Sequence, residues 1–231
     1  MQRILVLNPK GGSGKTTIAT NLASYFASMG GRPMLSDNDP QGSSMRWLKK
    51  RKAEQPFIQG LAAFERNSRM TRAWQMRIPP EVSHVVVDTP AAIPAQDLPE
   101  MTRSADSIII PVLPSDIDIH AFSKCIADLL LIAKIRRDEN RIGVVANRVK
   151  RNTLTYQSLM RFLESLRIPV VAILRDSQNY VRAAELGVGL HEMKRNLVQQ
   201  DLADWDPMLR WLRAKEVSGT PHDLDQLPET A

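Results

Sequence analysis

A glycine-rich segment near the start of the sequence has the residue types and the spacing of a phosphate-binding loop. Residues 8–17 read Asn-Pro-Lys-Gly-Gly-Ser-Gly-Lys-Thr-Thr. Glycines let backbone N–H groups turn toward phosphate oxygens, and a helix that follows the loop presents its positive end to the same anion. We expect Lys15 to reach the outer phosphates of a nucleotide and the Thr16 hydroxyl to join the coordination of Mg²⁺. The other predicted phosphate-binding residues are Gly11, Gly12, Ser13, Gly14 and Thr17.

Three aspartates stand where strands are expected to end. Asp37 and Asp39 belong to the segment Asp-Asn-Asp-Pro-Gln-Gly-Ser, and Asp88 follows three consecutive valines. Hydrolysis of a nucleoside triphosphate requires an in-line water and compensation for the charge that spreads over the transferred phosphoryl group. We expect Asp37 to orient that water and Asp39 and Asp88 to support a Mg²⁺ ion together with Thr16. Asp37 and Asp39 could exchange these roles.

Short β-branched runs alternate with stretches of helical spacing, and these elements must position the loop and the aspartates. Strands are predicted at residues 4–7, 84–87, 107–111, 142–145 and 170–174, with a short strand ending at Ser36. The clearest helices are residues 17–29, 121–136 and 155–166. This alternation is typical of βαβ units, and strands that are apolar throughout fit a parallel sheet buried on both faces. The sequence therefore predicts an α/β fold, a single doubly wound domain with a mostly parallel central sheet flanked by helices.

Two segments are predicted to lie at the periphery of this domain. Residues 46–78 are polar and basic, and we expect helices and loops there. From residue 217 the sequence is polar and contains prolines, which is typical of a loose tail. We therefore expect residues 1–215 to form the folded domain and residues 216–231 an acidic, loosely ordered tail.

The charge and the cysteine content restrict the partners and the compartment. The 231 residues contain 31 Lys and Arg against 25 Asp and Glu, a formal charge of +6. Four acids and no Lys or Arg follow Lys215, so residues 1–215 alone carry +10. This surplus favours a polyanionic partner, nucleic acid first and an anionic membrane second. Cys125 is the single cysteine, which excludes an internal disulfide and favours a reducing cytoplasm. Neither a signal peptide nor a membrane span is expected, because the longest apolar stretch, residues 126–135, contains two charges.

The phosphate loop departs from the usual pattern of such loops. Pro9 stands where the motif G-x-x-x-x-G-K-[ST] has glycine, and a second lysine, Lys10, precedes the glycine pair. The loop resembles the deviant Walker A motif of the ParA/MinD family of P-loop ATPases. Residues 37–43 resemble the switch I of that family, residues 88–90 its Walker B motif and switch II, and residues 111–115 its next strand end. The resemblance runs from residue 1 to about residue 190 and implies the P-loop NTPase fold.

This resemblance implies a chemistry shared between two subunits. It implies ATP and Mg²⁺ as cofactors, and a slow ATPase that an activator stimulates. Lys10 would place its cation on the phosphates bound by the other subunit, so that a homodimer closes over two ATP molecules. Asn147 and Arg148, just after a predicted strand, resemble the family's adenine-contacting pair. Ala91 departs from the family, which commonly has a second proline there, and this leaves the geometry of switch II open.

The family contains branches with different binding partners. ParA-like proteins bind DNA without sequence preference through basic residues of their C-terminal surface. The residues that match those positions or lie near them are Arg175, Lys194, Arg195, Arg210, Arg213 and Lys215. A MinD-like membrane-cycling regulator is the alternative, but its C-terminal amphipathic helix is basic whereas this chain ends in acidic residues and prolines, so no stable membrane association is expected. An ATP-dependent ligase of the same fold is a further alternative.

The resemblance thus predicts a small ParA-type ATPase, cytoplasmic and associated with the nucleoid. The phosphate loop begins within ten residues of Met1, which leaves no room for the N-terminal helix-turn-helix of larger ParA proteins. The expected cargo is a plasmid, a chromosome or a protein body such as a carboxysome. The expected partner is a cargo-bound activator protein with a basic N-terminus.

Overall fold

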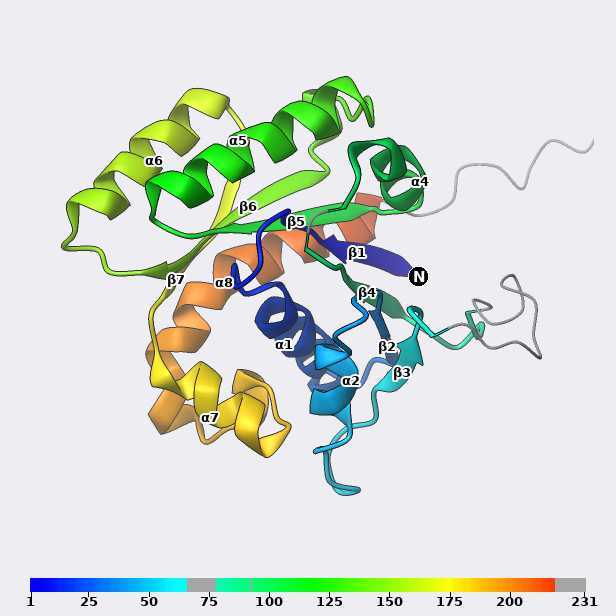
Figure 1. Cartoon of the computed structure of the whole chain (residues 1–231). Helices are drawn as coiled ribbons and strands as arrows, with labels where there is room; N and C mark the ends of the chain where they lie inside the picture. Colours follow the sequence, from blue (N-terminus) through cyan, green and yellow to red (C-terminus); the bar gives the residue numbers. More distant parts are fainter. Residues whose placement is uncertain (66–77, 92, 219–231) are drawn as a thin grey trace, which may run out of the picture.

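A computed structural model describes residues 1–65, 78–91 and 93–218, and these residues form three layers with a sheet in the middle (Figure 1). The sheet has seven strands in the order β3-β2-β4-β1-β5-β6-β7, and every neighbouring pair is parallel. The predicted α/β fold with a central sheet flanked by helices is confirmed, and the sheet is parallel throughout.

The elements have the following bounds. The strands are β1 (Gln2–Val6), β2 (Pro33–Asp37), β3 (Gln59–Ala62), β4 (His84–Asp88), β5 (Ser107–Val112), β6 (Ile142–Val149) and β7 (Val170–Arg175). The α-helices are α1 (Lys15–Ser28), α2 (Ser43–Leu48), α4 (Leu98–Arg103), α5 (Asp116–Leu131), α6 (Leu154–Leu166), α7 (Gln178–Leu186) and α8 (Arg195–Ser218). The short 3₁₀ turns among the described residues are η1 (Ala95–Asp97), η2 (Arg137–Glu139) and η3 (Leu190–Glu192).

Successive residues of the central strands face opposite helical layers. In β1, Ile4 and Val6 belong to a core that also contains residues of α1 and α8, whereas Leu5 belongs to a second core with residues of α5 and α6. Figure 1 shows α4, α5 and α6 on one side of the sheet and α1 and α8 on the other. Both faces of the central strands are therefore buried, which explains why these strands are apolar throughout instead of alternating.

The structure corrects the start of one predicted helix and the assignment of part of the peripheral segment. α5 begins at Asp116 and not at residue 121, because the hydroxyl of Ser115 accepts a hydrogen bond from the Asp118 N–H (3.2 Å) and so caps the helix. Residues 59–62, predicted as helix or loop, form the edge strand β3 beside β2. The part of the predicted peripheral segment at residues 66–77 lies outside the described residues.

The C-terminal helix α8 was not predicted, and it crosses one face of the sheet from β7 to β1. In its first half, Asp204 pairs with Arg175 at the end of β7, and in its second half the Leu212 carbonyl oxygen accepts a hydrogen bond from the Gln2 side chain at the start of β1 (3.1 Å). α8 continues to Ser218, and residues 219–231 of the predicted acidic tail lie outside the described residues. None of the described helices combines the length and the apolar character needed to cross a membrane.

Acid should destabilise the fold through His191, whose ring lies 4.8 Å from the Tyr25 ring and 6.4 Å from the Trp205 ring. Burial lowers the pKa of His191 from 6.5 to about 4. Between pH 6.5 and pH 4, His191 is therefore protonated in the unfolded chain and neutral in the folded chain. The folded state loses stability relative to the unfolded state as the pH falls through 6.5 toward 4. We expect the free energy of unfolding to drop by about 2 kcal/mol between pH 7.5 and pH 5 from this group.

Urea unfolding at the two pH values measures this difference. His191→Phe should reduce the pH dependence by that amount, whereas the control His120→Phe, at an exposed position of α5, should leave it unchanged. An equal pH dependence in the parent and in His191→Phe would contradict the assignment.

Candidate nucleotide-binding site

The glycine-rich loop lies between the carboxyl end of β1 and α1. The buried side chain of Asn8 holds its first turn, because it donates a hydrogen bond to the Pro111 carbonyl oxygen (2.5 Å) and accepts one from the Lys10 N–H (2.7 Å). Gly12 and Gly14 have φ values of +78° and +95°, which side-chain-bearing residues rarely adopt. No side chain among the described residues caps α1, so the N–H groups of its first turn are available to an anion.

Lys15 places a buried cation at this loop. Its Nζ donates a hydrogen bond to the Lys10 carbonyl oxygen (3.1 Å), and the residue is 7% exposed. Burial lowers the pKa of Lys15 below its ordinary value, and the negative charges of Asp88 and Asp39 oppose this effect. A bound polyphosphate would stabilise the charged lysine in the same way, so the loop and Lys15 together form a site for a phosphate chain.

The end of β4 offers an oxygen cluster that fits Mg²⁺. Asp88 Oδ2 accepts hydrogen bonds from the hydroxyls of Thr16 (2.8 Å) and Ser44 (2.7 Å), whereas Oδ1 is buried without a partner among the described residues. Burial raises the pKa of Asp88 to about 6, which is the expected response of a carboxylate that lacks a cation. The part of the chain that the structure describes contains no cluster of three His, Cys, Asp or Glu residues suited to a metal. A Mg²⁺ ion would therefore also need phosphate oxygens as ligands.

The structure gives the two aspartates after β2 different surroundings. Asp37 is fully buried, and its carboxylate accepts hydrogen bonds from the N–H groups of Asp39 (3.1 Å) and Met45 (3.0 Å). Both of its oxygens thus hold the backbone between β2 and α2. Asp39 is partly exposed, accepts a hydrogen bond from the Gln41 N–H (2.9 Å) and acts electrostatically on Lys15. Asp39 is therefore the more accessible of the two to water and to a nucleotide, and the division of roles between them stays a prediction.

Asn147 packs directly on the phosphate loop. Its Nδ2 donates a hydrogen bond to the Ser13 carbonyl oxygen (2.8 Å), and its Oδ1 accepts one from the Arg148 N–H (3.0 Å). A Cβ atom on Gly14 would lie 2.3 Å from Asn147 Nδ2, so this contact requires glycine at position 14.

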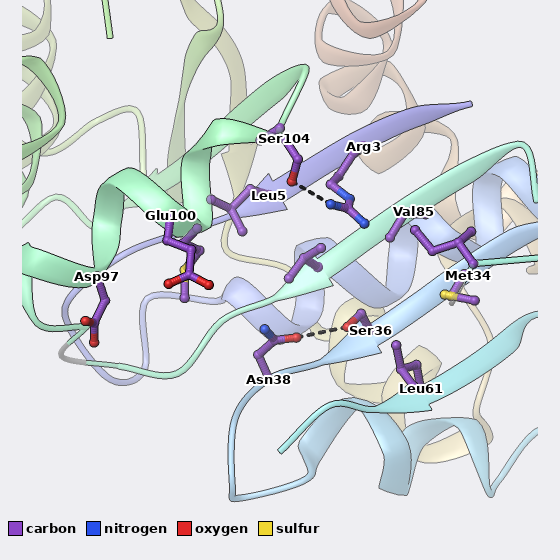
Figure 2. A pocket seen from close by; sticks show the side chains of 14 residues that line it. Arg3, Leu5, Met34, Ser36, Asn38, Leu61, Val85, Asp97, Glu100 and Ser104 are labelled. Atoms are coloured by element: carbon purple, nitrogen blue, oxygen red, sulfur yellow. Dashed lines mark hydrogen bonds between the residues drawn. The ribbon is translucent and has the colours of Figure 1, made fainter. Parts of the chain in front are cut away.

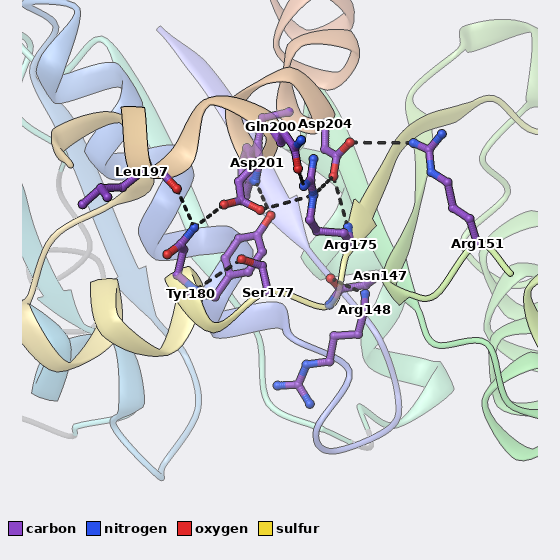
Figure 3. Close-up of polar contacts among 12 residues, drawn as sticks. Asn147, Arg148, Arg151, Arg175, Ser177, Tyr180, Leu197, Gln200, Asp201 and Asp204 are labelled. Carbon is purple, nitrogen blue, oxygen red and sulfur yellow. Dashed lines mark hydrogen bonds and ion pairs between the residues drawn. The ribbon is translucent and has the colours of Figure 1, made fainter. Parts of the chain in front are cut away.

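The predicted strand end at residue 145 was wrong, since β6 continues to Val149 with a register shift after Ala146. The Arg148 side chain is exposed and extends away from the neighbouring polar network (Figure 3). The adenine contact of this pair stays a prediction.

The Lys10 side chain is held by a carboxylate of its own chain. Its Nζ lies 2.8 Å from Asp118 Oδ2 at the start of α5. The Lys10 side chain is 35% exposed and that of Asp118 is 5% exposed. The second lysine of the loop therefore sits at the surface, paired with a buried carboxylate.

The six basic residues predicted to bind DNA do not form a single cluster. Arg175 lies against α8, with its Nε 3.0 Å from Asp204 Oδ2 and 3.4 Å from Asp201 Oδ1, as Figure 3 shows. The exposed members lie at both ends of α8: Lys194 and Arg195 at its start, and Arg210 and Arg213 in its second half. At a rise of about 1.5 Å per residue, Arg195 and Arg213 are about 27 Å apart along the helix.

The side chain of Lys215 is also held by neighbouring residues. Its Nζ lies 4.1 Å from the centre of the Trp211 ring and donates a hydrogen bond to the Asn140 carbonyl oxygen. Burial and the nearby Arg141 lower the pKa of Lys215 to about 8. Asn140 precedes β6, so Lys215 lies near the amino ends of the strands, whereas the phosphate loop lies at their carboxyl ends.

A separate cavity of about 400 Å³ lies on the sheet face opposite α1 (Figure 2). Met34, Leu61 and Val85 line its apolar part. Arg3 and Glu100 also line it, and Arg3 Nη1 donates a hydrogen bond to the Ser104 hydroxyl (2.5 Å). No residue of the phosphate loop lines this cavity, so it is distinct from the nucleotide site.

Sequence reasoning missed three residues that shape the site, namely Asn8, Ser44 and Asp118. Each is a short polar side chain that is buried. Ser44 follows the aspartate segment closely enough to be noticed, and Asp118 stands in the Ser-x-x-Asp spacing that is typical of a helix start. Their partners Pro111, Asp88 and Lys10 come from other elements of the chain, which the spacing alone does not reveal.

Comparisons with known proteins identify the family of the chain. The family of CobQ/CobB/MinD/ParA nucleotide-binding domains matches residues 4–190. A "Maintenance of carboxysome distribution protein A" from Gloeobacter kilaueensis is 39% identical over 116 residues, which span 50% of this chain and 51% of that protein. A protein of the same name from Halothiobacillus neapolitanus is 28% identical over 196 residues, which span 82% of this chain and 87% of that protein.

Solved structures share the fold at low sequence identity. A putative plasmid partition protein from Borrelia burgdorferi bound to AMPPNP has a TM-score of 0.69 at 13% identity, over 93% of this chain and 99% of that one. The MinD cell division protein of Aquifex aeolicus has a TM-score of 0.66 at 16% identity, over 98% of this chain and 100% of that one.

Proposed function

Because the chain belongs to the CobQ/CobB/MinD/ParA family of nucleotide-binding domains, we propose that it is an ATPase of the ParA type. It dimerises on ATP, binds DNA without sequence preference over the nucleoid in the cytoplasm, and positions a cargo as it hydrolyses ATP. The observation that carries this proposal is the arrangement of two lysines at one phosphate loop. Lys15 is buried against the loop. The Lys10 side chain is 35% exposed and pairs with Asp118 outside the loop, where it can reach a second subunit.

In this proposal each residue of the site has one task. The loop amides and Lys15 bind the outer phosphates, and Thr16 and Asp88 would hold a Mg²⁺ ion, which would neutralise charge on the phosphates. Asp39 orients the attacking water, and Asp37 holds the segment that carries Asp39. Lys10 supplies the last positive charge to the nucleotide of the other subunit, so the complete site exists in the dimer.

The relatives favour one kind of cargo. Two curated relatives are named for the maintenance of carboxysome distribution, which supports a carboxysome-like protein body over a plasmid or a chromosome. A cargo-bound activator protein with a basic N-terminus would stimulate hydrolysis and release the dimer from DNA. An ATPase assay with DNA and proteins encoded beside this chain tests this part, and an activator should raise turnover only when DNA is present.

DNA retardation tests the switch itself. Unrelated duplexes should be retarded in ATP and not in ADP or without nucleotide, and the affinity should fall steeply with salt, because each phosphate contact releases about one counterion. Equal retardation in all three nucleotide states would contradict the proposal. Sedimentation with anionic liposomes in ATP would indicate a membrane-cycling regulator, and turnover that requires a metabolite would indicate a ligase.

Two matched double variants locate the DNA contacts on α8. Lys194→Ala with Arg195→Ala removes two charges at the start of the helix, and Arg210→Ala with Arg213→Ala removes two charges in its second half. The double variant that removes the DNA-contacting pair should weaken DNA binding about tenfold or more at moderate salt. It should also lower the slope of the salt dependence of binding by about two. The other pair then serves as the control, since both carry the same change in net charge.

A further inference from the structure

We propose that Asp118 is a positioning residue that holds Lys10 in its own subunit and opposes the transfer of this lysine to the nucleotide of a second subunit. The inference rests on the proposed ATP-driven pairing and adds a regulation to it. The contact that carries it is the 2.8 Å ion pair between Lys10 Nζ and Asp118 Oδ2.

The Asp118 carboxylate is fixed in place. It lies in the first turn of α5, where Ser115 accepts a hydrogen bond from the Asp118 N–H and its hydroxyl in turn donates one to the Asp118 carboxylate. The side chain is 5% exposed. A carboxylate held in this way cannot follow the long lysine side chain outward, so transfer of Lys10 breaks the ion pair.

Breaking the pair is unfavourable because of what stays behind. Asp118 Oδ1 is buried without a hydrogen-bond partner among the described residues, so Lys10 supplies the cation for a carboxylate that has no other. A buried charge that loses its counter-ion costs more than an exposed one. The free energy gained at the second subunit's phosphates must exceed this cost, and the contact thus sets a threshold for pairing.

The backbone of Lys10 links this threshold to the nucleotide. The Lys10 carbonyl oxygen accepts hydrogen bonds from Lys15 Nζ (3.1 Å) and from the Ser13 hydroxyl (3.2 Å). Phosphates bound to the loop would draw Lys15 away from this oxygen. The binding of a nucleotide therefore removes a contact that holds Lys10, and the lysine becomes easier to release after the subunit's own site is filled.

The test compares Asp118→Asn with the matched control Asp116→Asn in the full-length chain. Asp116 is an exposed carboxylate of the same helical turn, so both variants remove one charge from the start of α5 and only one removes the partner of Lys10. The first measurement is the rate at which a small acetylating reagent modifies Lys10 in the nucleotide-free monomer, followed by mass spectrometry. The second is the dissociation constant of the dimer in a non-hydrolysable ATP analogue, from analytical ultracentrifugation.

We expect Asp118→Asn to accelerate the acetylation of Lys10 several-fold and to tighten the dimer about tenfold, with Asp116→Asn near the parent in both. Unchanged acetylation would overturn the holding contact. Accelerated acetylation with an unchanged or weaker dimer would overturn the threshold. A parent chain that does not dimerise with the analogue would refute the proposed function, whereas the acetylation measurement would still judge the contact. Equal melting temperatures of the two variants check that both are folded.

Discussion

Lys10→Ala should lower ATP turnover in the presence of DNA and activator by about 10³-fold, because a cation supplied across a subunit interface to a transferring phosphoryl group contributes about that factor or more. The same variant should fail to dimerise on ATP. The affinity of one chain for one nucleotide should change little, since Lys15 and the loop amides remain. Equilibrium titration with a fluorescent ADP analogue, ultracentrifugation and a phosphate-release assay separate these three quantities.

A nearby lysine provides the control for this variant. Lys124 is exposed on α5 and lines a cavity that also contacts Pro9, next to Lys10. Lys124→Ala therefore removes the same charge from the same region without touching the phosphate loop, and it should keep the parent's activity. If Lys10→Ala dimerised and turned over ATP like Lys124→Ala, the shared site would have to be abandoned.

Asp39→Asn should slow hydrolysis by about 10²-fold or more while the ATP-bound dimer persists, because a general base or a group that orients the attacking water accelerates a reaction by a factor of that order. The asparagine retains the shape of the side chain and one oxygen to accept the Gln41 N–H. The variant should therefore accumulate as a dimer on DNA, and single-turnover hydrolysis should measure the loss directly. A normal rate in Asp39→Asn would assign the water to another residue.

Asp37→Asn is the contrast, because it changes a neighbouring carboxylate with a structural task. Asp37 is fully buried and accepts two backbone hydrogen bonds, so an amide at this position would place an N–H group against the N–H of Asp39 or Met45. We expect a loss of about 2 kcal/mol in the free energy of unfolding. Urea titration of both variants distinguishes the roles, since Asp39→Asn should unfold like the parent.

The sequence predicted the parts of this molecule that follow local rules. The apolar strands, the glycines with positive φ and the Thr16–Asp88 neighbourhood are consequences of periodicity, backbone freedom and the meeting of parallel strand ends at one edge. β3 was missed because Gln59 and Gly60 have little strand propensity, and its place beside β2 comes from the sheet.

The remaining features depend on contacts between distant segments. The Lys10–Asp118 pair joins residues 108 positions apart, and the Arg175–Asp204 pair joins residues 29 apart. The different surroundings of Asp37 and Asp39 depend on the backbone of α2, and no pattern of residue types distinguishes two aspartates so close together. These contacts explain why the elements around the phosphate loop could be predicted from the sequence while the partners of its side chains could not.

The strand order also determines when a growing polypeptide can first bind nucleotide. β1 lies between β4 and β5, so both of its sheet neighbours are made after residue 83, and β2 also waits for β4. A nascent chain of 65 residues contains the whole phosphate loop but has no Asp88 to meet Thr16 and no Pro111 to anchor Asn8. Pairing across such long sequence separations is slow, and its apolar strands stay exposed until it occurs. ATP can therefore assist folding only after the nascent chain has emerged from the ribosome as far as β5. Fragments that end before β5 should aggregate whether or not nucleotide is supplied.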